Sequence, residues 1–456
     1  MRGITKGTVL QTRPLVILYE FSALRILHFF TLQPKFPLLF CKTACIMHFI
    51  KSPFCMEGIP MKSFSRKASA IHESSTLAVS ALANRLKAEG KDVINFGTGE
   101  PDFDTPENIK NAAIDAIHAG KTKYTPASGL PALKAAVCKR LEADTGVRYE
   151  PSEIVIATGA KHSIYIALCC LLDEGDEVIV PAPYWVTYTE SVAMAGGTPV
   201  VIPTTREQHF KLTPEALEAA ITPKTKLLIL NNPSNPTGMC YDEAELRAIC
   251  ETCLKHDLWI MADEIYYKLV YDGRKFVSAA ALSPEIKAHT IIVNGVSKSY
   301  AMTGWRIGYT ACDAKLSKIM SNYLSHATSA PSTISQWAAI EALEGPQESV
   351  EEMRRVFEQR RTYMADRINS LPGVSCLMPE GAFYVMMNME EVIGRTLGGK
   401  LIQNGSDFAM AFLEAENVAL VPCGGFGEPN YLRWTYAASM EDIRRGLDRL
   451  EHFLKG

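Results

Sequence analysis

Several features are missing from this chain of 456 residues, and most of these absences exclude a class of protein. No basic stripe stands out and the formal net charge is −3, so nucleic acid is not an expected partner. The motif GxxxxGK[ST] has no suitable match, which argues against a nucleoside triphosphatase. Internal repeats and low-complexity tracts are absent too. A composition of 47% hydrophobic and 21% charged residues is typical of an ordinary globular protein.

A dense disulfide framework is not expected, because the chain has only twelve cysteines in 456 residues. Cys250 and Cys253 form a CxxC motif, but no second pair follows at the spacing of a zinc site. Both fall in "EAELRAICETCLKH", which has the pattern of an amphipathic helix. We therefore predict that they pack in the core, that the chain binds no metal, and that it works in a reduced, cytosolic compartment.

A clean apolar run long enough to cross a membrane, about 20 residues, is missing from the first sixty residues. Glu20, Arg25 and His28 interrupt the apolar runs there, so no membrane association is expected. The stretch is basic and poor in acidic residues, as transit peptides are, but it is rich in Phe instead of Ser. A transit peptide and an upstream start codon both stay open. We favour the second, with the protein beginning near Met56 or Met61.

Short apolar runs rich in Val and Ile recur along the middle of the chain, separated by helical patterns. These runs are residues 153–158, 176–183, 198–203, 226–231, 258–263, 290–295 and 307–311. Such runs are typical of strands that are buried on both faces of a sheet. Helices between the strands predict βαβ crossovers, and so an α/β fold with a mainly parallel central sheet flanked by helices.

The pattern changes after about Gly345, and the length of the chain favours two domains. A long charged helix is followed by two strand-like segments, "GAFYVMMNM" and "YLRWTYA", and by a last helix. This order predicts a smaller α+β domain. The predicted organisation is an atypical extension (1–60), a segment that joins the small domain (61–105), a large domain (106–345) and the small C-terminal domain (346–456).

Polar motifs follow the predicted strands of the large domain. They are "TGAKHS" after 153–158, "APYW" in 182–185, "NNPSNPTG" in 231–238, "ADEIYY" in 262–267 and "GVSKSY" in 295–300. In open α/β sheets, ligands bind at the carboxyl ends of the strands. The sequence therefore predicts that these polar side chains collect along one edge of the sheet.

Five motifs together resemble the class I aminotransferases, which are fold-type I enzymes that use pyridoxal 5'-phosphate (PLP). They are "GEPDFDTP" (99–106), "TKYTPASG" (122–129), "PAPYWVTY" (181–188), "PSNPTG" (233–238) and "SKSYAMTGWRIGY" (297–309). The resemblance runs from about Met61 to the C-terminus and is nearest to bacterial aspartate aminotransferases of the branch that includes prephenate aminotransferases. It implies the fold-type I architecture, PLP as cofactor, and a homodimer with shared active sites.

The resemblance assigns five residues to the ring of the cofactor. Lys298 matches the lysine whose amine forms an imine with the cofactor aldehyde and later moves the substrate proton. Asp263 matches the partner of the pyridine nitrogen. Tyr266 and Asn235 match the partners of the phenolic oxygen, and Trp185 matches the aromatic residue that stacks on the ring. Simpler readings exist for several of them, such as a capping carboxylate for Asp263 and a core tryptophan for Trp185.

A second group is expected to hold the phosphate. Arg306 matches the arginine of the phosphate clamp, because a guanidinium fork suits a phosphate. Gly159, Ala160 and Lys161 lie at a helix start, whose backbone N–H groups and dipole favour an anion. Tyr124 matches the tyrosine that reaches the phosphate of the neighbouring subunit.

The remaining residues are expected to bind the substrate, together with Trp185 and Asn235. Arg433 matches the arginine that binds the α-carboxylate, and a strand arginine on a solvated face is the alternative. Gly99 matches a backbone contact to the same carboxylate. Lys161 and Thr76 match positions that recognise the distal carboxylate of acidic substrates, although Lys161 also suits an ordinary helix start.

The predicted reaction is therefore transamination from L-aspartate to 2-oxoglutarate, with prephenate as a further candidate acceptor. A PLP-dependent C–S lyase, or an aminotransferase for aromatic or neutral amino acids, has the same core motifs and stays open. A PLP-binding regulator without turnover is disfavoured, because no helix-turn-helix pattern precedes the body of the chain.

Overall fold

The computed structural model describes residues 63–71 and 75–456. The expectations for residues 1–60 lie outside this part of the chain. Residues Ser65–Gly456 form one compact unit, which contains two main sheets. Within the described ranges, no helix combines the length and the apolar character that a bilayer crossing requires.

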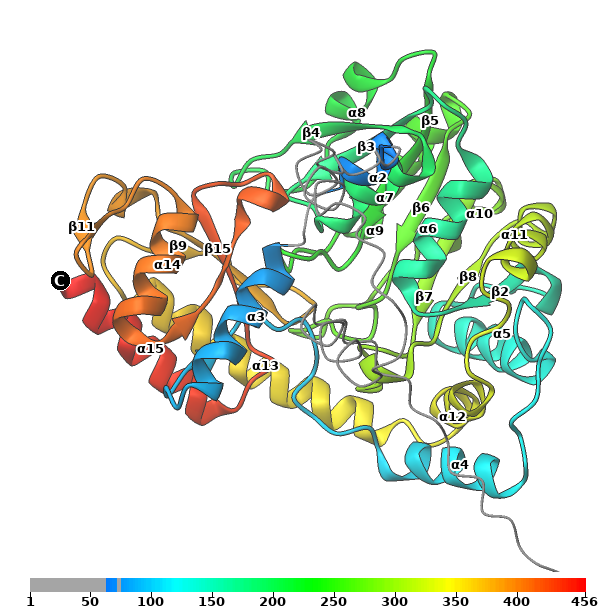
Figure 1. The fold of residues 1–456 in the computed structure, drawn as a ribbon. Coiled ribbons are helices and arrows are strands. Elements are labelled where there is room, and N and C mark those ends of the chain that lie inside the picture. The colour runs from blue at the N-terminus through cyan, green and yellow to red at the C-terminus, as the bar shows by residue number, and fades with distance from the viewer. Residues whose placement is uncertain (1–62, 72–74) are drawn as a thin grey trace, which may run out of the picture. The chain divides into compact units, whose positions relative to one another are not determined.

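The larger sheet has seven strands, in the order β2, β8, β7, β6, β5, β3, β4 (Figure 1). Their bounds are β2 (Ile154–Ala157), β3 (Glu177–Ala182), β4 (Thr198–Pro203), β5 (Thr225–Asn231), β6 (Trp259–Asp263), β7 (Thr290–Gly295) and β8 (Gly308–Ala311). All seven predicted runs are therefore strands of one sheet, and the α/β prediction is confirmed.

One strand of this sheet runs against the others. The pairs β4–β3, β3–β5, β5–β6 and β6–β7 are parallel, whereas β8 is antiparallel to both β7 and β2. A parallel return normally needs a crossover through a helix. Between β7 and β8 the chain forms only the short 3-10 helix η3 (Thr303–Trp305), so it returns directly. The sheet is mixed, and the reversed strand starts just beyond the Lys298 loop.

Helices cover both faces of the larger sheet. Alternate strand residues pack against α6 (Ala160–Leu171), α7 (Thr187–Ala195) and α11 (Ala314–Ala327) on one face. The opposite face is covered by α5 (Pro131–Thr145), α8 (Pro214–Ala220), α9 (Glu243–Lys255), α10 (Pro284–His289) and α12 (Thr333–Glu344), and α4 (Glu107–His118) packs on α12. Cys250 and Cys253 of α9 are fully buried in this second layer, as predicted for packing residues.

The smaller sheet is antiparallel, in the order β14, β15, β10, β9. Its strands are β9 (Ser375–Cys376), β10 (Tyr384–Asn388), β14 (Val421–Pro422) and β15 (Tyr431–Thr435), and its helices are α13 (Glu348–Asn369), α14 (Gly405–Glu416) and α15 (Met440–Lys455). The same part of the chain contains a separate antiparallel hairpin, formed by β11 (Thr396–Leu397) and β12 (Lys400–Leu401). One apolar core lies between these elements.

The segment that begins with α3 (Ser75–Ala88) joins this C-terminal part (Figure 1). β1 (Ile94–Asn95) pairs in parallel with β13 (Val418–Ala419). α3 packs beside β13 and β14, whereas the short α2 (Arg66–Ser69) has no buried residue. The chain then passes from β1 through residues 97–105 to the edge of the larger sheet, and this passage forms one wall of the site.

Candidate active site

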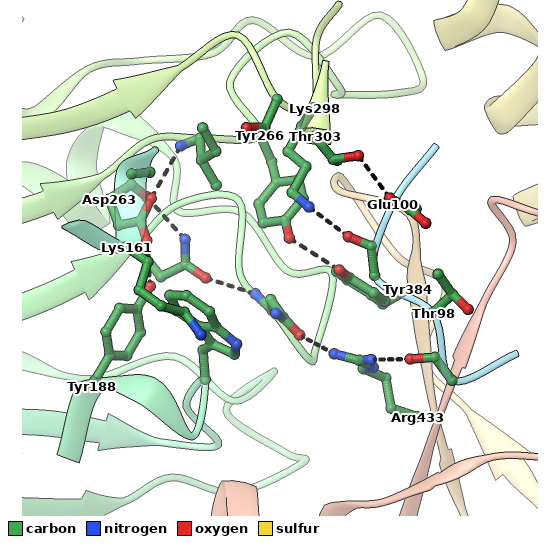
Figure 2. A pocket seen from close by; sticks show the side chains of 18 of the residues that line it. Thr98, Glu100, Lys161, Tyr188, Asp263, Tyr266, Lys298, Thr303, Tyr384 and Arg433 are labelled. Atoms are coloured by element: carbon green, nitrogen blue, oxygen red, sulfur yellow. Dashed lines mark hydrogen bonds between the residues drawn. The ribbon is translucent and has the colours of Figure 1, made fainter. Parts of the chain in front are cut away.

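A cavity of about 620 Å³ lies where the carboxyl ends of the parallel strands meet β1 and the smaller sheet. It brings together ten of the residues expected at the site: Gly99, Ala160, Lys161, Trp185, Asn235, Asp263, Tyr266, Lys298, Arg306 and Arg433. Figure 2 shows several of them pointing toward one another from elements that are far apart in the sequence. The predicted collection of polar residues at one sheet edge is therefore confirmed.

Lys298 lies in the loop after β7, and its amine is enclosed by the cavity. Its Nζ donates a hydrogen bond to the carbonyl of Gly99 at 2.5 Å. Burial lowers the pKa of this amine to about 8, and the carboxylates of Glu100 and Asp263 partly oppose that decrease. An amine with a pKa near neutrality loses its proton readily, so it can act as a nucleophile or as a base.

Asp263 ends β6 and is almost completely buried, with 3% of its surface exposed. Its Oδ2 accepts a hydrogen bond from the Tyr188 hydroxyl at 2.6 Å, and its Oδ1 accepts one from the Ile265 N–H at 3.2 Å. Burial raises the pKa of this carboxyl to about 6, although both hydrogen bonds and nearby Lys298 lower it. A carboxylate that is costly to bury favours a cationic partner, such as a protonated ring nitrogen.

Arg433 lies on β15 and is 2% exposed, so it does not lie on a solvated face. Its Nη1 donates to Oδ1 of Asn235 at 3.1 Å, and its Nη2 donates to the Gly97 carbonyl at 3.0 Å. The guanidinium also lies over the ring of Tyr384, 4.4 Å from the centroid. The hydroxyl groups of Tyr384 and Tyr266 are 3.0 Å apart. These contacts hold a guanidinium fork in one orientation inside the cavity.

The glycine turn before α6 is packed tightly against Arg306. Gly159 has φ +83°, and a Cβ there would lie 2.4 Å from Nη2 of Arg306. A Cβ on Gly308 would lie 2.2 Å from the Ala160 nitrogen. Arg306 itself has φ 58°, and its Nη2 donates to the Thr158 carbonyl at 3.3 Å. The guanidinium thus lies beside a helix N-terminus whose first N–H groups lack intrahelical partners, an arrangement that fits a phosphate.

Lys161 adds a further positive charge on the first turn of α6. Its Nζ lies 4.9 Å from the centroid of the Trp185 ring. Burial lowers the pKa of this amine, and the nearby Arg306 guanidinium lowers it further. Trp185 is partly buried and contacts Tyr188 edge-on, with centroids 5.5 Å apart. Lys161 is exposed, but it also lines the cavity, where its amine contacts an aromatic ring.

Of the other predicted residues, Gly159 precedes Ala160 of the wall and packs against Arg306, and the remaining two are Tyr124 and Thr76. Tyr124 is fully exposed and does not line the cavity. Thr76 lies in α3, but its side chain is outside the described part of the structure. The roles expected for both residues stay predictions.

Several cavity residues received no role from the sequence. Tyr188 contacts Asp263, and Tyr384 contacts Tyr266. Asn231 donates a hydrogen bond from Nδ2 to the Asp263 carbonyl at 2.9 Å. The structure also places Glu100 and Thr303 in the wall. Tyr188, Asn231, Glu100 and Thr303 lie within or beside the motifs already singled out. Tyr384 lies in none of these motifs and belongs only to the strand-like segment "GAFYVMMNM".

A buried carboxyl lies directly behind the site. Glu264 follows Asp263 but points into the core, where Oε1 accepts hydrogen bonds from Ser278 Oγ at 2.8 Å and the Ala279 N–H at 3.1 Å. Among the described residues, Oε2 has no hydrogen-bond partner. Burial raises the pKa of this carboxyl from 4.5 to about 8. Glu264 is therefore protonated in the native protein at neutral pH.

Replacing Glu264 by Gln is expected to flatten the dependence of stability on pH. Between pH 4.5 and 8 the native protein binds a proton at this carboxyl that the unfolded chain does not bind, so rising pH destabilises the parent. From pH 6 to 8 this amounts to about 2 kcal/mol of unfolding free energy. Melting temperatures measured across this range should fall less steeply for Glu264→Gln than for the parent. The exposed Glu174→Gln is the control, and parallel slopes for all three proteins would contradict a buried, protonated Glu264.

Comparisons with known proteins agree with this geometry. Residues 91–450 match the family model described as aminotransferase class I and II. The aspartate aminotransferase of Geobacillus stearothermophilus is 49% identical over 391 residues, which cover 86% of this chain and 98% of the relative. The aspartate/prephenate aminotransferase of Cereibacter sphaeroides is 48% identical over 389 residues, covering 85% and 97%.

Solved structures give the same result. The aspartate aminotransferase from Rhizobium meliloti superposes with a TM-score of 0.84 at 44% identity, covering 87% of this chain and 99% of that one. The aspartate aminotransferase from Thermus thermophilus with maleate has a TM-score of 0.81 at 38% identity, covering 86% and 100%. The similarity therefore extends over nearly the whole length of each relative.

Proposed function

Because the chain belongs to the class I and II aminotransferases, we propose that it transfers the amino group of L-aspartate to 2-oxoglutarate, yielding oxaloacetate and L-glutamate. One observation carries this proposal above the others. A single cavity holds the Lys298 amine together with two further cations, Arg433 and Lys161, which suit the two carboxylates of such substrates.

The residues present fit PLP, the cofactor of this family. Bound PLP supplies the aldehyde that accepts the amino group and the ring that accepts electrons. Arg306 and the first turn of α6 would hold its phosphate, where Gly159 and Gly308 leave no room for a Cβ. Asp263 would pair with the ring nitrogen.

Three further side chains complete the proposed cofactor site. Tyr266 and Asn235 would donate to the phenolic oxygen, and Trp185 would lie along the ring face. The hydrogen bond between Asn235 and Arg433 connects this group to the proposed substrate site.

The protein residues then divide the work of substrate binding and proton transfer. Arg433 binds the α-carboxylate with its fork and so orients the bonds at Cα. Once released from the Gly99 carbonyl, the Lys298 amine would take the proton from the substrate Cα and hold it for delivery. Its lowered pKa lets it start the cycle as a neutral amine at mildly alkaline pH.

Lys161, with Thr76, is proposed to bind the distal carboxylate of aspartate and glutamate. Lys161 is exposed but lines the cavity, and its amine lies over the Trp185 ring. One solved relative is described with maleate, which is itself a dicarboxylate. Lys161 and Arg433 both line the cavity, and two separate cations there favour a substrate with two carboxylates.

Lys161→Gln should separate acidic from neutral substrates. We expect kcat/KM for aspartate to fall about 10- to 100-fold, because one charge-assisted hydrogen bond is lost. The value for a neutral amino acid should change less than about threefold, since that substrate makes no such contact. Steady-state rates on both substrates measure this difference.

A matched control for Lys161→Gln is available at the surface. Lys121 also lies over a tryptophan ring, Trp337, at 5.1 Å, but outside the cavity. Lys121→Gln should leave both kcat/KM values unchanged. An equal loss on aspartate and on the neutral amino acid in Lys161→Gln would remove the proposed role in substrate choice.

The same substrate panel addresses the other candidate reactions. Prephenate is a second candidate acceptor, because the Cereibacter sphaeroides relative carries that name. A C–S lyase or an enzyme for neutral or aromatic amino acids is not favoured, since the relatives are named for aspartate. Repeated release of oxaloacetate excludes a regulator without turnover.

We further propose a homodimer, in which the fully exposed Tyr124 reaches the phosphate site of the partner. Mixing Tyr124→Phe with a Lys298→Ala chain and assaying the hybrid tests this proposal.

The pairing of β1 with β13 supports the proposed division into a large domain (106–345) and a small domain (61–105 with 346–456).

Nine free cysteines among the described residues favour the proposed reducing, cytosolic location.

A further inference from the structure

The segment Gly99–Thr105, here called the strap, runs along the loop 298–305 that carries the lysine. Four hydrogen bonds join the two segments: Lys298 Nζ to the Gly99 carbonyl at 2.5 Å, Thr303 Oγ1 to Glu100 Oε2 at 2.6 Å, Thr105 Oγ1 to the Ala301 carbonyl at 2.7 Å, and Trp305 Nε1 to Thr105 Oγ1 at 2.9 Å. Figure 2 shows the first two side by side in the cavity wall. The strap thus places the Glu100 carboxylate close to the Lys298 amine.

The charges around Lys298 are mostly positive, and Glu100 is one of two carboxylates in the described cavity wall that oppose them. The cationic groups that line this cavity with Lys298 are Lys161, Arg306 and Arg433, and the phenols are Tyr188, Tyr266 and Tyr384. Among the described residues of this wall, the carboxylates are only Asp263 and Glu100. Burial and the two arginines lower the pKa of the amine, and Glu100 is the strongest of the groups that raise it.

Bound ligands would neutralise most of these charges but not that of Glu100. The ring nitrogen would pair with Asp263, the phosphate with Arg306, and the substrate carboxylate with Arg433. Glu100 is hydrogen-bonded to the neutral Thr303, so its charge stays available to the lysine. It is exposed at the cavity mouth, where solvent screens but does not remove its field.

We propose that Glu100, held in place by Thr303, is a positioning residue that acts through Lys298 and sets the proton affinity of its amine. A base must hold the proton that it takes from Cα until it delivers that proton to the next carbon. Burial alone would make this amine a weaker base, and Glu100 restores part of that basicity. This inference rests on the proposed role of Lys298 in transamination.

The test measures the titration of Lys298 directly, in protein from which the cofactor has been removed. Acetic anhydride labels the neutral amine, and mass spectrometry quantifies the Lys298 peptide against a free reference amine from pH 6 to 10. In Glu100→Gln the midpoint should move to lower pH by about 0.5 to 1 pH unit, because one negative charge near the amine is lost. The absorbance titration of the cofactor-loaded protein should move in the same direction.

Salt distinguishes an electrostatic role from a structural one. Raising ionic strength from about 0.05 M to 1 M shortens the Debye length severalfold. The difference between the parent and Glu100→Gln should therefore shrink by at least about half. A difference that does not respond to salt would indicate a rearranged wall and would overturn the proposal.

Variants at Thr303 and Asp104 separate the hydrogen bond from the charge. Thr303→Val keeps the Glu100 charge but releases its carboxylate, so its midpoint should move in the same direction by a smaller amount. Thr303→Ser restores the hydroxyl and should restore the parent midpoint. Asp104→Asn removes an equal charge from the same strap outside this cavity and should have less than about a third of the effect of Glu100→Gln.

Equal midpoints for the parent and Glu100→Gln would refute the proposal, as would equal shifts in Glu100→Gln and Asp104→Asn. Melting curves show whether each variant is folded. If Glu100→Gln does not fold, Thr303→Val still tests the proposal. Failure of this inference is separable from failure of the proposed function. The labelling midpoint is defined whether or not the protein transaminates aspartate, whereas the substrate panel does not depend on Glu100.

Discussion

Lys298→Ala is expected to lower kcat for aspartate transamination at least about 10⁴-fold. The substitution removes both the nucleophile that binds the cofactor and the base that moves the substrate proton, and each role alone contributes about 10²- to 10⁴-fold. In the cavity, no second lysine is placed like Lys298, since Lys161 lies beside Trp185 on α6. Steady-state oxaloacetate release at saturating aspartate and 2-oxoglutarate, with PLP added, gives kcat.

Lys298→Arg is the matched control for charge. A guanidinium keeps the positive charge but does not lose its proton in the accessible pH range, so it cannot act as a nucleophile or base. We expect a loss about as large as that of Lys298→Ala. Borohydride should fix PLP to Lys298 in the parent and leave no pyridoxyl adduct at this position in either variant. A variant that keeps more than about a hundredth of the parent rate would contradict the assigned role of Lys298.

Asp263→Asn should have the second largest effect, a loss of kcat of about 10²- to 10³-fold. The amide keeps the size of the side chain and can accept a hydrogen bond from Tyr188, but it carries no charge to hold a proton on the ring nitrogen. Electron acceptance by the ring depends on that proton, so the chemical step should slow more than substrate binding weakens. Steady-state kcat and KM separate the two quantities.

Tyr188→Phe is the control that keeps the carboxylate and removes one of its donors. Loss of this hydrogen bond should raise the pKa of Asp263 further above its ordinary value, because the bond stabilises the charged form. At pH 8 the carboxyl should still be ionised, so the loss of kcat should stay below about tenfold. A rate for Asp263→Asn within about threefold of the parent would show that this carboxylate does not support the reaction.

Much of the fold follows from local patterns. Each of the seven apolar runs is a strand, and in six of them Val and Ile occupy largely buried positions, as expected for strands covered on both faces. The seventh, β4, lies at the edge of the sheet and is mostly exposed or half-buried. The reversed direction of β8 could not be predicted, because an isolated strand pattern does not specify its direction. That direction depends on the short return through η3, which is a property of the whole connection.

The site could be predicted in part, because several of its residues lie in motifs that are local in the sequence. Lys298, Asp263 and Arg306 lie in motifs whose spacing is local, and all three line the cavity. Tyr384 and the pair formed by Glu100 and Thr303 depend on contacts between distant segments: Thr303 lies 203 residues after Glu100, and Tyr384 lies 118 residues after Tyr266. No local pattern specifies such pairs.

The sequence by itself determined the strands, the motifs at their ends and the identity of the reactive amine, because these depend on side-chain type and short spacing. Only the tertiary structure decided which charges surround that amine. It buried Asp263 and Arg433, left Lys298 half-buried beside them, and placed Glu100 of the strap at their edge. Proton affinity depends on burial and on nearby charge, and neither exists until the chain is folded.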